Sequence, residues 1–100
     1  MRLTQTELDR VLIFSVAEMA RRRRQRGIKL NHPESIALIS DELMELARAG
    51  VSYEDVVAAG TQILTMDDVM DGVADLVDVV RLECVFDDGS RLVVIHQPIR

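Results

Sequence analysis

The sequence predicts an α+β fold that is mainly helical, with about four helices followed by a short antiparallel β-hairpin, in a single domain over residues 1–100. Two observations lead to this prediction. Helix-start and helix-stop signals alternate along the chain as far as Gly72. After Gly72 the apolar residues change to the spacing of strands, on both sides of the turn sequence Asp88-Gly89. The apolar share of 48 % is enough for a core, which must be aliphatic because only 3 % of the residues are aromatic.

One short pattern marks three of the expected helix starts. The segments "LTQTEL", "VSYEDV" and "LTMDDV" each contain an apolar residue, a hydroxyl residue, two further residues, an acid and an apolar residue. This order is typical of a capping box inside a hydrophobic staple. The cap and acid of the three boxes are Thr4 and Glu7, Ser52 and Asp55, and Thr65 and Asp68.

The other helix boundaries follow from proline and glycine. In "NHPES" Pro33 suits the first helical position, so the cap is Asn31 or His32. The helix stops fall at Gly27, Gly50 and Gly72, where a left-handed residue is expected. The resulting helices cover about 5–26, 33–49, 53–63 and 66–71. Apolar side chains share one face of the first helix (Leu8, Val11, Leu12, Val16, Met19, Ala20) and are expected to be buried on the second (Ile36, Ile39, Leu43, Met44, Ala47).

The stretch "VVRLECVFDDGSRLVVIH" predicts the hairpin. A two-residue turn at Asp88-Gly89 would pair three couples on one face: Phe86 with Arg91, Cys84 with Val93, and Leu82 with Ile95. Both faces of this hairpin carry apolar residues, and such a sheet needs cover on both sides. The helices can shield one face, and we expect a partner on the other.

Five arginines stand in "ARRRRQRG", in a chain of net charge −5. On a helix, Arg22, Arg23 and Arg26 continue the apolar face, whereas Arg21 and Arg24 point away from it. Because the run spreads around the helix, it forms no single phosphate-binding stripe. The favoured interpretation is a basic helix end that pairs with carboxylates. Ion pairs across a subunit interface are the main alternative, and the acidic balance disfavours nucleic-acid binding.

No catalytic or metal-binding motif stands out. His32 is explained by its place before Pro33, and His96 is expected to be a hydrogen-bonded structural or interface residue. Cys84 alternates with core residues and is expected to be buried, and the acids of "MDDVMD" are explained by the capping box. No membrane span or signal sequence is recognisable, so we expect a cytoplasmic protein. The candidate interface residues are therefore Arg22, Arg23, Arg26 and His96.

The sequence resembles the gamma subunit of bacterial urease. The resemblance runs from "LTQTELDRVL" through "RRRRQRGIKLNHPESIALIS" and "LTMDDVMDGV" to "VFDDGSRLVVIHQPI", and so covers essentially the whole chain. The blocks "GIKLNHPESIALIS" and "DDGSRLVVIHQPI" are its most specific parts. The chain departs from the usual family pattern at Leu46, Met66 and Ala74.

The resemblance implies a small helical subunit with a short hairpin that packs with the alpha and beta subunits of urease, in an alpha–beta–gamma unit that trimerises. Urease hydrolyses urea to ammonia and carbamate at a nickel centre, and the family holds that centre on the alpha subunit. It implies no catalytic residue, cofactor or metal ligand on this chain, and no nucleic acid or membrane partner. Two alternatives remain open: a stand-alone binding or regulatory module that uses the basic helix end, and a subunit of a different amidohydrolase.

Overall fold

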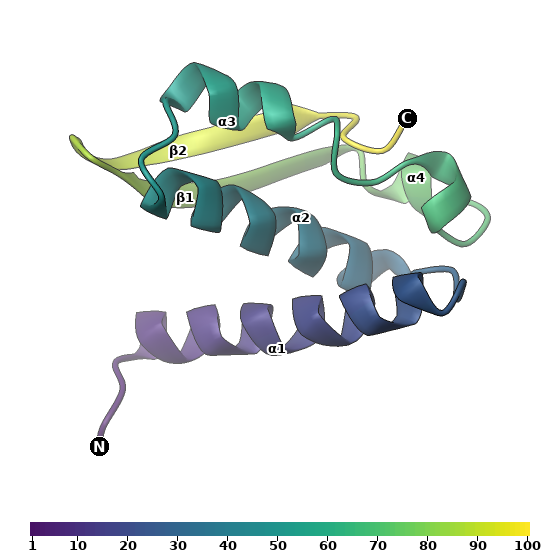
Figure 1. Ribbon diagram of the computed structural model, residues 1–100, viewed down its shortest axis with the longest axis horizontal. Coiled ribbons are helices and arrows are strands. Elements are labelled where there is room, and N and C mark those ends of the chain that lie inside the picture. Colours follow the sequence, from purple (N-terminus) through teal and green to yellow (C-terminus); the bar gives the residue numbers. More distant parts are fainter.

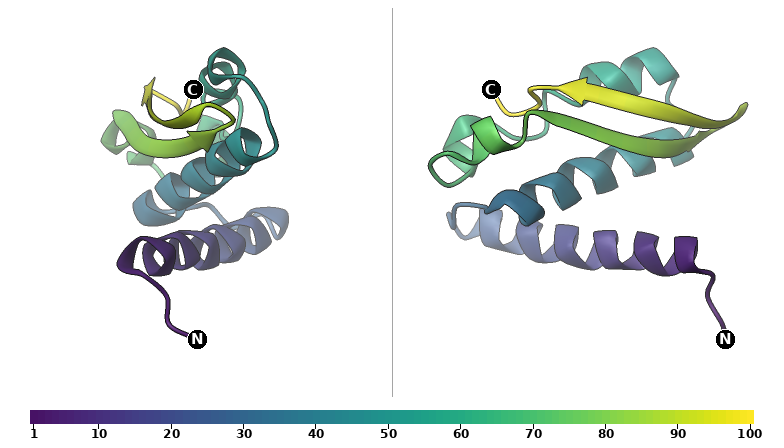
Figure 2. Two further views of the ribbon diagram at one scale, coloured as in Figure 1. Left: turned by 90° about the vertical axis from the view of Figure 1, so that its left-hand side faces the viewer. Right: turned by 180° about the vertical axis from the view of Figure 1, so that it is seen from behind.

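The computed structural model describes all residues, 1–100, and has the predicted mainly helical α+β architecture. Its elements are α1 (Gln5–Gln25), α2 (His32–Arg48), α3 (Tyr53–Ala59), a 3₁₀ turn (Met66–Asp68), α4 (Val73–Leu76), β1 (Val79–Phe86) and β2 (Gly89–His96). Three layers are stacked: α1, then α2, then the hairpin with α3 beside it (Figures 1 and 2). The central helix α2 therefore contacts α1 on one side and β1 and α3 on the other.

Reciprocal capping boxes start the two long helices. At α1, the Thr4 hydroxyl accepts a hydrogen bond from the Glu7 amide at 3.1 Å, and the Glu7 carboxylate accepts one from the Thr4 amide at 2.9 Å. At α2, Asn31 and Glu34 make the same two bonds at 3.0 and 2.9 Å. The structure thus selects Asn31 as the cap, with Pro33 in the first turn.

The third expected start is also confirmed, but its helix is shorter than predicted. Ser52 accepts a hydrogen bond from the Asp55 amide at 3.2 Å. The helix ends at Ala59, and Gly60 caps it. A Cβ on Gly60 would lie 2.5 Å from Cδ1 of Ile95, so the missing side chain lets α3 approach β2. This contact explains the glycine that the sequence placed inside the helix.

The expected helix over 66–71 is replaced by the 3₁₀ turn Met66–Asp68. Asp68 still accepts from the Thr65 amide at 2.9 Å, as the capping signal predicts. The next residue, Val69, is extended because it forms an isolated parallel bridge with Leu30, which lies in the loop between α1 and α2. Gly72 has a φ of 84° but leads into α4 instead of ending a helix.

The hairpin forms, but its predicted register is wrong by two residues. Phe86 pairs with Gly89 and Leu82 with Val93, so Asp87 and Asp88 make the turn. Gly89 takes the positive φ of 121° as the first residue of β2. A shift of two residues leaves every side chain on the same face, because strand side chains alternate with a period of two. The predicted division into two faces therefore survives the change of register.

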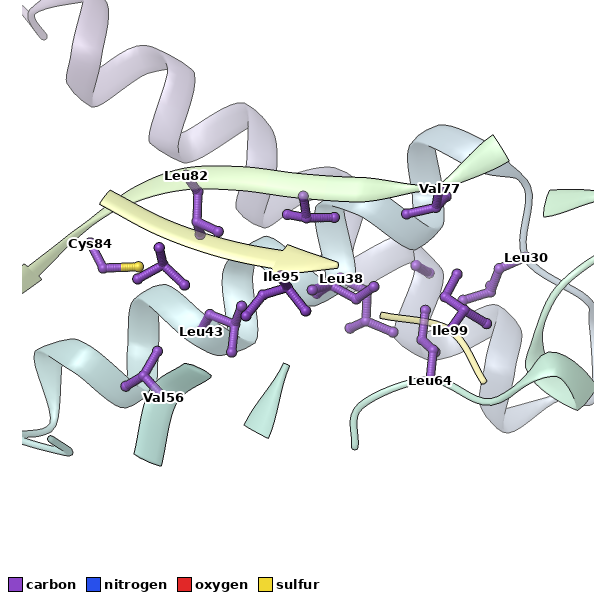
Figure 3. Close-up of a cluster of buried hydrophobic side chains, with 14 of the residues drawn as sticks. Leu30, Leu38, Leu43, Val56, Leu64, Val77, Leu82, Cys84, Ile95 and Ile99 are labelled. Atoms are coloured by element: carbon purple, nitrogen blue, oxygen red, sulfur yellow. The ribbon is translucent and has the colours of Figure 1, made fainter. Parts of the chain in front are cut away.

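The core lies between α2, α3 and the inner face of the hairpin. Leu38 and Leu43 of α2, Val56 of α3 and Ile95 of β2 meet there (Figure 3). Three of the residues expected to be buried on α2 are fully so (Ile39, Leu43, Ala47), and the other two, Ile36 and Met44, are partly buried against the same cluster. Cys84 is buried, as predicted.

Candidate functional site

The outer face of α1 carries an apolar stripe that the chain itself leaves exposed. Leu8, Val11, Leu12 and Met19 follow one another at helical spacing, and the Leu12 side chain is 55 % exposed. The inner face, which packs on α2, has only the small Ala17 and Ala20 fully buried. The apolar periodicity read from the sequence is therefore real, but the stripe lies on the side opposite the core. Ala20, which the sequence placed on the same face, instead belongs to the buried core. An exposed apolar patch of this kind marks an interaction surface.

Ion pairs take the place of apolar packing between α1 and α2. The carboxylate of Asp41, in α2, is 2 % exposed and lies between two arginines of α1. Nη1 of Arg10 lies 2.7 Å from Oδ1 of Asp41. Arg21, further along the same helix, pairs with the other carboxylate oxygen. Arg21 also pairs with Glu42 at 2.9 Å, and Arg10 with Glu45 at 3.1 Å. These contacts fix the side of α1 that faces the domain and so orient the stripe outward.

The ion pairs shift the pKa values of the groups they join. Burial alone would raise the pKa of Asp41, but hydrogen bonds and charges from Arg21 and Arg10 outweigh burial and hold it below its ordinary value. Burial would likewise lower the pKa of Arg21, and the carboxylates of Asp41 and Glu42 raise it instead. Asp41 is therefore ionised throughout the physiological pH range.

This network supplies the carboxylate partners that the favoured interpretation of the arginine run expects. Arg21 and Arg24 point away from the apolar stripe and pair with carboxylates of the same chain. Arg21 is only 25 % exposed and binds Asp41, and Arg24 binds Asp68 at 3.2 Å. The sequence reasoning missed Asp41 altogether. The pattern that could have indicated a buried acid opposite α1 is the spacing of Arg10, Ala17 and Arg21, which places them on one face of that helix.

The candidate interface arginines differ in their surroundings. Arg22 is 74 % exposed and lies 4.0 Å from Glu18, and Arg26 is exposed at the end of the helix. Both extend the apolar stripe. Arg23 instead pairs with Glu34, the acid of the α2 capping box, and so ties the end of α1 to the start of α2. An interface role for these arginines remains a prediction.

The outer face of the hairpin mixes apolar and charged side chains, since Arg81 and Glu83 are exposed on it together with Val85 and Leu92. Val85 and Leu92 point away from the helices and are exposed, whereas Leu82 and Val93 face the core. As predicted, the helices cover one face of the hairpin. The expected partner for the other face stays a prediction.

The two histidines lie on different elements and are exposed. His32 is the first residue of α2, and His96 is the last residue of β2. The hydrogen bond from Arg100 reaches the backbone carbonyl of His96 and not its side chain, and an interface role for His96 stays a prediction. No group of three or more His, Cys, Asp or Glu side chains is placed to hold a metal ion. The donor set of this chain therefore does not fit a nickel centre.

None of the helices combines the length and the apolar character that a membrane crossing requires. The described surfaces give the class of the protein: a small α+β chain with exposed apolar side chains on α1 and on the hairpin.

Comparison with known proteins gives the family. A family model described as "Urease, gamma subunit" matches residues 1–99. The urease subunit gamma of Natronomonas pharaonis is 54 % identical over 100 residues, which are 100 % of this chain and 92 % of that protein. The urease subunit gamma of Laribacter hongkongensis is 51 % identical over the full length of both chains. The chain therefore belongs to the urease gamma subunit family.

One relative has a longer polypeptide. The urease subunit gamma/beta of Pseudomonas syringae pv. syringae is 51 % identical to this chain over 100 residues. The match covers all of this chain but only 43 % of that protein.

Proposed function

We propose that this chain is a structural subunit of a nickel-dependent urease, a complex that hydrolyses urea to ammonia and carbamate. It packs with the alpha and beta subunits, contributes no catalytic residue, and joins an alpha–beta–gamma unit that trimerises in the cytoplasm. Membership of the gamma subunit family supports the assignment of this chain to a urease. The gamma/beta relative supports the beta subunit as a partner.

The single observation that carries the packing role is the orientation of α1. Five of its large apolar side chains are exposed, whereas Ile13 and Val16 are partly buried. Its inner face has only alanines fully buried, beside the ion pairs. These side chains are already about half buried, so covering one Leu or Met of the stripe contributes about half of the roughly 1.5–3 kcal/mol that full burial gives. We assign the stripe of Leu8, Val11, Leu12 and Met19 to the catalytic alpha subunit, with Arg22 and Arg26 placed to meet carboxylates at its end.

The nickel and the catalytic groups belong, in this proposal, to the alpha subunit. The support from this chain is its donor set, because its two histidines stand on different elements and its cysteine is buried. We expect the isolated chain to hydrolyse no urea and to bind no nickel in stoichiometric amount. Calorimetric titration with nickel and an ammonia-release assay measure both.

Co-expression with the alpha and beta subunits of the same organism tests the proposal. The expected result is one complex that contains all three chains, elutes as a trimer of the three-chain unit and releases ammonia from urea once loaded with nickel. Failure of this chain to co-elute with alpha would overturn the proposal and favour a stand-alone module. A stable complex that hydrolyses another amide but leaves urea intact would assign the chain to a different amidohydrolase.

A further inference from the structure

A hollow of about 310 Å³ lies at the end of the molecule where β2 runs into the C-terminal segment. Met66 of the 3₁₀ turn, Ala74 of α4 and Ile99 give it an apolar lining. The segments that line the hollow are held in place. Ile99 belongs to the buried core, and the Met66 amide donates a hydrogen bond to the carbonyl of Arg100 at 3.2 Å. Figure 1 shows the C-terminus and α4 at one corner of the molecule and the N-terminus at the opposite corner.

Exposed apolar side chains and acidic side chains without an ion-pair partner lie in and beside the hollow. Leu76 of α4 is 68 % exposed and Met66 is 60 % exposed. Asp75 and Asp78 line the hollow, and neither takes part in any of the chain's ion pairs. The hollow is thus shaped for an apolar side chain that is accompanied by a positive charge.

We infer that the first segment of the urease beta subunit occupies this hollow, with an apolar side chain against Met66, Ala74 and Ile99 and a basic group facing Asp75 and Asp78. The inference rests on the proposed function. The gamma/beta relative carries the two subunits in one polypeptide, and this chain matches less than half of it. With gamma first, as in the name, the beta part follows the residue that corresponds to Arg100, which itself lines the hollow. Beta therefore starts beside the hollow, and the outer face of α1, whose N-terminal end lies at the opposite corner of the molecule (Figure 1), stays available to alpha.

A filling variant and a matched control test the hollow in the full complex. Ala74 lines the hollow and is half-buried, whereas Ala58 is exposed on α3. Tagged chains that carry Ala74→Trp or Ala58→Trp are co-expressed with alpha and beta, and the amounts of alpha and beta recovered on each are compared. We expect Ala74→Trp to lower the recovered beta about tenfold, the effect of losing one well-packed contact, and Ala58→Trp to leave it unchanged. Wild-type recovery of beta on Ala74→Trp would overturn the inference.

Two further measurements keep the test decisive if Ala74→Trp disturbs the fold. The charge reversal Asp75→Lys with Asp78→Lys changes two exposed side chains and should also reduce the recovered beta. A photoreactive benzoylphenylalanine at Leu76 should cross-link to beta, and the same group at Arg81, on the outer face of β1, should not. Cross-linking to beta from position 81 and not from position 76 would show that beta contacts the hairpin, and would refute the hollow as the beta site. If the wild-type chain recovers alpha, the proposed function holds, and a negative result at the hollow then counts only against the inference about beta.

Discussion

At the scale of single residues, Asp41 determines how α1 sits on the domain. Its carboxylate is almost fully buried, and it is neutralised by Arg10 and Arg21 from one face of α1. Removing one partner of a buried ionic cluster is costly because the other charges remain buried without compensation. The aliphatic contacts of α1 with α2 are too few to replace these pairs, since only Ala17 and Ala20 are fully buried on that helix.

We therefore predict that Asp41→Asn lowers the free energy of unfolding by about 3 kcal/mol at neutral pH. Urea denaturation followed by circular dichroism measures this change. Glu45→Gln serves as the control, because Glu45 is 66 % exposed and its pair with Arg10 should be worth about 1 kcal/mol or less. Equal effects of the two substitutions would contradict the assigned role of Asp41.

The same residue gives a pH dependence with a definite sign. The pKa of Asp41 is lower in the folded chain than its ordinary value of 3.8, so the folded state favours the ionised form. Its contribution to stability is complete above pH 3.8 and is lost as the pH falls through the lower, folded-state pKa. The unfolding free energy of the wild-type chain should thus decline more steeply below pH 4 than that of Asp41→Asn. Parallel curves in this range would show that Asp41 titrates normally.

Cys84 reports on the inner face of the hairpin. It is 1 % exposed, and burial raises the pKa of its thiol. Both effects slow its reaction with a thiol reagent such as dithionitrobenzoate. We expect the native chain at pH 8 to react about a thousandfold more slowly than the chain unfolded in urea, because reaction requires an opening that costs several kcal/mol. Comparable rates would mean that the hairpin is not held on α2.

At the scale of elements, the sequence predicted what depends on neighbouring residues and failed where distant residues decide. The capping pair at Thr4 and the left-handed glycines at the ends of α1 and α2 are local features, and each appears as expected. At Ser52 only half of the predicted box forms, because the side chain accepts from the Asp55 amide but Asp55 does not accept from the Ser52 amide. The shortened helix after Thr65 depends instead on the bridge between Leu30 and Val69, which joins segments far apart in the sequence. The hairpin register likewise depends on which residue accommodates the positive φ, and Asp-Gly allows more than one answer.

The candidate site was predictable only in part for the same reason. Periodicity identified the stripe of Leu8, Leu12 and Met19 but could not show that it faces away from α2. The helical positions of Arg21 and Arg24 were correct, yet their carboxylate partners lie on other elements and leave no local pattern. The helix face of a residue follows from its spacing, whereas its partners follow from the tertiary packing.

Gly60 tests the packing of α3 on β2. The substitution Gly60→Ala places a Cβ at 2.5 Å from Cδ1 of Ile95 and at 2.7 Å from its Cγ1. Because Ile95 is buried, the side chains packed around it must shift to make room. Overpacking of this kind lowers the free energy of unfolding by about 1–3 kcal/mol. Thermal unfolding should show a lower midpoint for Gly60→Ala. A midpoint at or above the wild-type value would mean that Ile95 repacks freely or that α3 sits further from the hairpin.

At the scale of the whole molecule, exposed apolar side chains lie at several places on the outside of the chain. The stripe on α1 and the outer face of the hairpin lie on opposite sides of the three-layer stack (Figure 2). The hollow beside α4 lies at a third place. A small subunit that is packed among larger chains needs such separate surfaces, because each neighbour covers a different one. This arrangement agrees with membership of the urease gamma subunit family.

The central claim is that the outer face of α1 attaches the chain to the alpha subunit. The most direct test is the size and composition of the complex formed when alpha and beta are co-expressed with a chain carrying Leu12→Gln and Met19→Gln. Both side chains are about half exposed, so the free variant should unfold within about 0.5 kcal/mol of the wild type. We predict that light scattering during gel filtration finds the variant outside the alpha-containing complex, while Ala58→Gln, on the exposed side of α3, assembles normally. A folded double variant that enters the complex in wild-type amount would contradict the account.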